Sequence, residues 1–180
     1  MKMIYAEMEQ NLKSTFWRDA AKAGGVAGVA LAILMLIMNT LQARGASVGV
    51  ISHWLEFFIM FVSIYWFGKV RAAKYGRDGF TYGQSVGYTA AMMLFAGFLY
   101  GLGMFLVLKN PAQTQSLIDS TAAVSTAISG AAPDQTTLDM MRSMYRSPLL
   151  YVFGGILYTV AYGVFVSLFL SVFIKTPRTR

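Results

Sequence analysis

The chain has 180 residues, of which 56% are hydrophobic and none is cysteine, and its formal net charge is +7. Without cysteine, the chain cannot form disulfide bonds, thiolate metal sites, iron–sulfur clusters or a thiol nucleophile. The apolar content leaves too little polar sequence for a separate soluble domain. We therefore expect a single transmembrane domain that covers residues 1–180.

The segment before the first long apolar run shows a helical periodicity. Ile4, Met8, Leu12 and Phe16 are spaced four residues apart, and the charged residues of this segment largely occupy other faces of the wheel. This pattern predicts an N-terminal amphipathic helix that lies at the membrane interface.

Four long apolar runs follow, each long enough to cross a hydrocarbon core of about 30 Å as a helix that rises about 1.5 Å per residue. They predict an all-α fold, an integral membrane four-helix bundle. The predicted spans are residues 24–43, 49–68, 80–108 and 149–174.

The outer loop between the third and fourth runs, residues 109–148, is the long polar stretch of the chain. Apolar residues at helical spacing on both sides of Pro133 predict two short extracytoplasmic helices. Ser147 and Pro148 predict a helix cap and a first-turn proline at the start of the last span.

Eleven of the fifteen basic residues lie before the first span, between the second and third, or after the fourth. By the positive-inside rule, this distribution places both termini in the cytoplasm. The same charges favour a lipid bilayer that includes anionic lipids as a partner. Nucleic acid is not expected, because no aromatic-interleaved basic patch accompanies the charge. The four remaining basic residues are Arg44, Lys109, Arg142 and Arg146.

Small residues four apart let membrane helices approach closely. This spacing predicts helix-packing positions in the first, third and fourth spans. Two interpretations stay open: packing within one bundle, or a functional contact that is a homodimer interface or a moving gate. The predicted packing glycines are Gly24, Gly28, Gly79, Gly83, Gly87, Gly97, Gly101, Gly155 and Gly163.

Glu56 and His53 are the ionisable pair inside the predicted spans, three residues apart on one helix face. A carboxylate inside a membrane is costly and usually faces protein or water with a partner. Three interpretations compete: a locking network with Arg44 or with a tyrosine of the last span, a proton or ion path, and a metal or catalytic site. The candidate tyrosines include Tyr158 and Tyr162.

Several segments together resemble a family of small four-span proteins catalogued as domain of unknown function forty-one ninety-nine. They are residues 79–85 (GFTYGQS), the Ser147–Pro148 entry to the last span, residues 167–175 (SLFLSVFIK) and the stretch from Phe16 to Gly28. The resemblance implies a four-helix membrane domain of a bacterial inner membrane. It implies no substrate and no catalytic residues.

From the residues we expect a non-enzymatic structural or accessory membrane subunit that needs no cofactor. No phosphate-binding loop, zinc-protease helix or nucleophile elbow is recognisable in the sequence. The alternative is a small transporter or channel with Glu56 and His53 on a proton or ion path.

Overall fold

The computed structural model describes residues 2–44, 48–75, 79–109 and 111–176, without the side chains of residues 2–13, 43 and 112. The described chain is helical throughout its regular elements, as expected. Its helices are α1 (Lys2–Ala43), α2 (Gly49–Ala73), α3 (Tyr82–Leu108), α4 (Pro111–Ser129), α5 (Gln135–Tyr145) and α6 (Pro148–Ile174).

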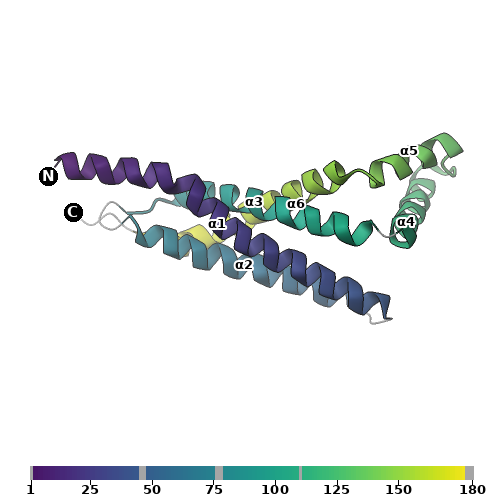
Figure 1. Cartoon of the computed structure of the whole chain (residues 1–180), viewed down its shortest axis with the longest axis horizontal. Coiled ribbons are helices and arrows are strands. Elements are labelled where there is room, and N and C mark those ends of the chain that lie inside the picture. Colours follow the sequence, from purple (N-terminus) through teal and green to yellow (C-terminus); the bar gives the residue numbers. More distant parts are fainter. Residues whose placement is uncertain (1, 45–47, 76–78, 110, 177–180) are drawn as a thin grey trace.

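The helices form an elongated molecule with two different ends (Figure 1). The beginning of α1 and the end of α6 lie together at one end, which we call the terminal end. The helices α4 and α5 lie at the opposite end, which we call the cap end. The long helices α1, α2, α3 and α6 run between these two ends.

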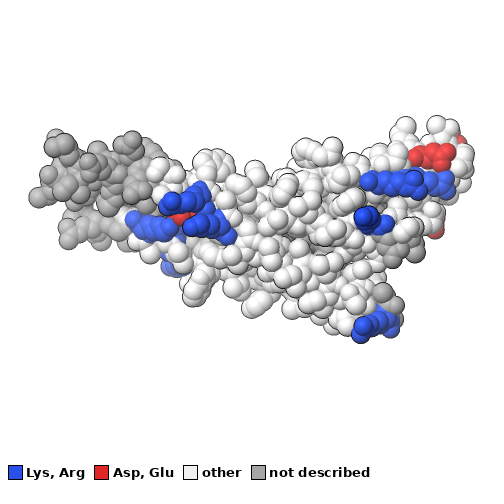
Figure 2. Space-filling view, in the orientation of Figure 1, with Lys and Arg blue, Asp and Glu red and all other residues white. Residues whose placement is uncertain are grey.

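Four helices of the described chain are long and apolar enough to cross a membrane, and the candidate spans are Ser14–Gln42, Gly49–Ala73, Tyr82–Leu108 and Pro148–Ile174. On the face shown in Figure 2, a broad belt without charged residues separates charged groups at the terminal end from charged groups at the cap end. A protein surface that is covered by the hydrocarbon core of a membrane is expected to show this distribution of charge.

The N-terminal segment is helical, as predicted, but it joins the first span without a break in the 42-residue helix α1. The side chains of Ile4, Met8 and Leu12, which carried the amphipathic pattern, lie outside the described residues. A position at the membrane interface stays a prediction.

Helix α3 is the centre of the bundle, because it packs along α6 on one side and along α1 on the other. Glycines make both contacts close. A Cβ added to Gly97 or Gly155 would lie 2.7 Å or less from backbone atoms of the facing helix, and one added to Gly28 would lie 2.7 Å from the carbonyl oxygen of Ala96. Gly24 and Gly101 also face backbone atoms of a neighbouring helix, whereas a Cβ on Gly163 would meet the side chain of Met93.

The expectation that Gly83 and Gly87 pack against another helix is wrong for the described bundle. Both are exposed, and a Cβ on either would meet no atom within 4 Å. Gly79 is buried just before α3, and its φ of 70° is a conformation that glycine adopts without strain.

Polar bonds join α3 to α6 along the same interface. The Thr159 hydroxyl donates to the carbonyl of Met93 at 2.9 Å, and the Ser171 hydroxyl donates to Ser85 at 2.8 Å. At the terminal end, Phe80 and Thr176 exchange backbone hydrogen bonds of 3.2 and 3.1 Å. The segment before α3 is thereby fastened to the segment after α6.

The helix starts combine expected and unexpected caps. Pro148 stands in the first turn of α6 as predicted, but Ser147 makes no side-chain capping bond. Thr81 and Gln84 form a capping box at the start of α3. Asp134 caps α5, and hydrogen bonds from Thr137 lower the pKa of the Asp134 carboxyl.

Candidate functional site

The Glu56 carboxylate lies on the buried stripe of α2 and is 7% exposed. The hydroxyl groups of Tyr100 on α3, Ser52 on α2 and Tyr158 on α6 lie close enough to interact favourably with it. The rings of Tyr100 and Tyr158 are stacked, with their centroids 5.8 Å apart. One carboxylate thus joins three helices through hydroxyl groups.

The other candidate residues lie at different distances from this carboxylate. His53 is exposed and hydrogen bonds through Nδ1 to the carbonyl of Gly49 at 2.8 Å, and it is close enough to Glu56 to interact with it electrostatically. Arg44 is exposed at the end of α1, and it is not among the partners of Glu56 that the described residues provide.

Tyr162 belongs to the aromatic surroundings of the site rather than to its hydrogen bonds. Its ring lies 6.2 Å from that of Tyr158 and 5.5 Å from that of Phe57, measured between centroids. Its hydroxyl is buried and has no hydrogen-bond partner among the described residues. Of the two predicted tyrosines, Tyr158 therefore serves Glu56 directly.

This arrangement can hold a charge in place, and it offers little for catalysis. The hydroxyls around Glu56 belong to two tyrosines and a serine, and His53 points its Nδ1 at a backbone carbonyl. Nucleophilic catalysis needs a nucleophile in contact with a base that is itself oriented by a third group. The contacts of the described residues instead tie α2 to α3 and α6.

A second polar centre lies at the terminal end and was not predicted. Arg71 on α2 is 1% exposed, and its Nη1 lies 2.6 Å from Oδ2 of Asp19 on α1. The Lys74 ammonium also lies 2.6 Å from Oδ2 of Asp19, but the Lys74 side chain is 45% exposed. The Thr15 hydroxyl accepts a further bond of 3.2 Å from Arg71.

Aromatic rings surround the buried guanidinium of this centre. The Cζ atom of Arg71 lies 5.8, 5.5 and 5.9 Å from the ring centroids of Phe16, Tyr75 and Tyr88. Cations over ring faces within about 6 Å are attracted by the ring quadrupole, most strongly when desolvated. The centre therefore joins α1, α2 and α3, as Glu56 joins α2, α3 and α6.

A signal for this second centre is present in the sequence. The buried residues of α2 follow one another at three- and four-residue steps, and Glu56 and Arg71 lie on the same stripe. The burial of Arg71 was not predicted, because Arg71 lies among other basic residues and follows residue 68, where the apolar run ends. The helix continues to Ala73, and this extension carries the guanidinium into the bundle.

The comparisons with known proteins give a family and nothing more. A family model described as "Protein of unknown function (DUF4199)" matches residues 22–176. No curated protein and no solved structure gives a significant match. The matched range includes Glu56, Tyr100, Tyr158 and Arg71, and it begins just after Asp19.

Proposed function

The chain belongs to the family described as protein of unknown function (DUF4199), and from that premise we propose that it is a multi-pass membrane protein with a structural or accessory role. In this proposal it is a non-enzymatic subunit of a bacterial inner membrane. Both termini lie in the cytoplasm, and its partners are anionic lipids together with a second copy or another membrane protein.

One observation supports this role best: the two buried polar centres connect helices to one another. Asp19 pairs with Arg71 across α1 and α2, and tyrosine hydroxyls of α3 and α6 lie close enough to Glu56 to interact with its carboxylate. Polar groups inside a membrane bundle act as ties when their partners come from neighbouring helices. Enzymes and transporters instead gather such groups around a bound substrate.

The distribution of charge supports the orientation. Arg18, Lys22, Lys69, Arg71, Lys74 and Lys175 belong to the terminal end, and Arg44, Lys109, Arg142 and Arg146 to the opposite one. The positive-inside rule assigns the richer end to the cytoplasm.

A second candidate function is the movement of a proton or ion past Glu56 and His53. One observation favours it: Tyr158, which interacts with the carboxylate, is 41% exposed, so the carboxylate lies one side chain away from the surface of the bundle.

A flux assay separates the two functions. The purified parent and Glu56→Gln are reconstituted into liposomes, and proton and potassium fluxes are recorded under an imposed gradient. The structural role predicts no flux above that of empty liposomes from either protein. Flux through the parent that disappears in Glu56→Gln would contradict the structural role and support the second candidate.

A stability measurement on tyrosine variants tests the tie itself. Tyr100→Phe removes a hydroxyl that Glu56 uses, so we expect the unfolding free energy to fall by about 1 kcal/mol, the scale of hydrogen bonds between membrane helices. Tyr162→Phe is the matched control, because its hydroxyl has no partner in the described part of the chain. Equal stability of the two variants would argue against a structural role for Glu56.

A further inference from the structure

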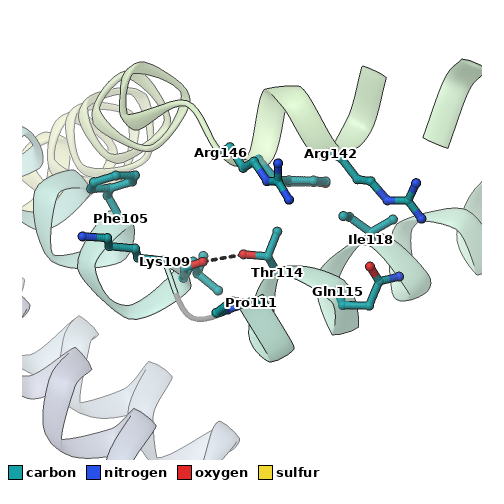
Figure 3. Close-up of a pocket in the computed structure, with 10 residues that line it drawn as sticks. Phe105, Lys109, Pro111, Thr114, Gln115, Ile118, Arg142 and Arg146 are labelled. Carbon is teal, nitrogen blue, oxygen red and sulfur yellow. Dashed lines mark hydrogen bonds between the residues drawn. The ribbon is translucent and has the colours of Figure 1, made fainter. Parts of the chain in front are cut away.

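A pocket of about 320 Å³ opens at the cap end between α3, α4 and α5. Its wall combines basic groups from two different segments with the first turn of α4 and an apolar floor (Figure 3). The lining residues that matter for its chemistry are Lys109, Arg142, Arg146, Thr114, Phe105 and Ile118.

Three basic side chains border this pocket. Lys109 directly follows α3, Arg142 lies in the last turn of α5, and Arg146 directly follows α5. Basic residues are disfavoured on the outer side of a membrane protein, yet three of the four that the described chain carries at the cap end line this single cavity. Figure 3 shows Arg146 reaching across toward Thr114 on α4, with Lys109 to one side and Arg142 to the other.

Acidic groups neutralise this charge only in part. Arg142 pairs with Asp139 at 2.7 Å, and both side chains are exposed. Asp119 accepts a hydrogen bond of 2.8 Å from Gln115, which also lines the pocket. Lys109 and Arg146 form no ion pair with any residue that the structure describes. Two cations therefore remain available to an anion from outside the chain.

The first turn of α4 adds a second positive contribution. Pro111 and Thr114 line the pocket, so this turn borders the same space as the three basic side chains. The first N–H groups of a helix have no acceptor within the helix, and the helix dipole favours an anion there. Together with guanidinium groups, such N–H groups are the usual ligands of phosphate oxygens.

The apolar part of the pocket wall indicates which kind of anion the pocket fits. Phe105 and Leu108 come from the last turn of α3, and Ile118 of α4 is 2% exposed. Phe105 and Leu108 lie at the end of the candidate span Tyr82–Leu108. A ligand that fits both parts carries a phosphate beside an apolar chain.

We propose that this pocket binds a phosphate group, and that the group is the headgroup of an anionic phospholipid in the outer leaflet. The guanidinium of Arg146 is the principal ligand, supported by Lys109 and the first turn of α4. Only the lipid as the source of the phosphate rests on the proposed function, since a free phosphate ion would meet the same ligands.

The test measures binding to the detergent-purified full chain with two probes. Dihexanoyl phosphatidylglycerol carries a phosphate and short acyl chains, and inorganic phosphate carries the anion alone. Dissociation constants are measured for the parent, Arg146→Gln and Arg44→Gln. The last is the matched control, because it removes an exposed basic residue of the cap end that does not line the pocket.

We expect Arg146→Gln to weaken phosphatidylglycerol binding about tenfold or more, the scale of a charged hydrogen bond, and Arg44→Gln to bind as the parent does. Arg146→Lys keeps the charge without the paired donors and should bind between the parent and Arg146→Gln. The Arg146 side chain is exposed, and circular dichroism of each variant confirms that its helices are retained.

The outcomes separate the source of the phosphate from the existence of the site. Tighter binding of phosphatidylglycerol than of inorganic phosphate supports the lipid, and equal binding of both supports a site for free phosphate. No binding of either probe by the parent, or equal losses in Arg146→Gln and Arg44→Gln, would overturn the proposal. Flux through Glu56 would refute the structural role and leave this site untouched.

Discussion

Two charged residues lie on the buried stripe of α2, and each is met by groups from other helices. Arg71 is the more completely enclosed, and its carboxylate partner is Asp19 on α1. Breaking a buried ion pair from one side leaves a desolvated charge, which costs about 3–5 kcal/mol. The stability of the bundle should therefore depend strongly on Asp19.

We expect Asp19→Asn to lower the unfolding free energy by several kcal/mol in detergent, since it removes the carboxylate that lies 2.6 Å from the buried guanidinium of Arg71. Asp139→Asn is the control: it breaks the exposed pair with Arg142 and should cost less than about 1 kcal/mol. Denaturant unfolding followed by circular dichroism measures both. Similar losses in the two variants would show that the Asp19 pair is no more important than a surface pair.

The sequence is informative about a single residue when that residue contrasts with its neighbours. Glu56 stood out because the residues around it are apolar, and the structure places it with Tyr158, one of the tyrosines considered for it. Arg71 has basic neighbours, so the local sequence did not distinguish it as a buried residue. Arg44 is exposed, and it is not among the partners of Glu56 that the described residues provide.

At the scale of elements, the close approach of α3 and α6 depends on glycines, which carry no side chain at the contact. We expect Gly155→Ala to destabilise the bundle by about 1–3 kcal/mol, since its Cβ would press on the backbone of Gly101 and Gly97, which cannot turn away. Gly87→Ala is the control. Its Cβ meets nothing within 4 Å, so better helix propensity should leave stability unchanged or raised by up to about 1 kcal/mol.

Thermal unfolding of the two alanine variants beside the parent measures this contrast. A Gly155→Ala protein as stable as the parent would mean that α3 and α6 separate more easily than their contacts imply. A destabilised Gly87→Ala protein would mean that its open face is covered in the membrane, as expected for an interface with a second copy.

Glycines spaced four residues apart define one face of a helix, but the spacing does not show whether that face points toward the other helices or away from them. On α3 the row from Ser85 through Thr89, Met93, Gly97 and Gly101 is buried, whereas Gly83 and Gly87 are exposed. The two rows are offset by two residues, or about 200° around the helix. Which row faces inward is decided by α1 and α6, so the sequence of α3 alone could not choose between them.

At the scale of the molecule, the absence of cysteine makes the orientation directly testable. Single cysteines at Lys175 and Ser129 lie at the terminal end and the cap end, and both positions are exposed. In spheroplasts, we expect a membrane-impermeant maleimide to label Ser129→Cys at once and Lys175→Cys only after permeabilisation. The reverse pattern would invert the orientation, and labelling of both in intact spheroplasts would contradict four spans.

Helix number and type were predictable from apolar runs because hydrocarbon thickness sets a minimum length for a span. The cap helices were predictable as short periodic segments on both sides of Pro133. The pocket between them was not, since Lys109 and Arg146 meet only through the fold. Such proximity between residues far apart in the sequence depends on how the helices are arranged, and no local sequence pattern predicts it.

The position of α3 between α1 and α6 has a consequence for biogenesis. Ribosomes make α3 early, but its glycine face, its Met93 carbonyl and its Ser85 hydroxyl gain their partners only from α6, which begins forty residues after α3 ends. Until then α1 is its chief neighbour. The nascent bundle therefore lacks a partner on one side of α3. The backbone pairing of Phe80 with Thr176 can form only after the last span has been translated.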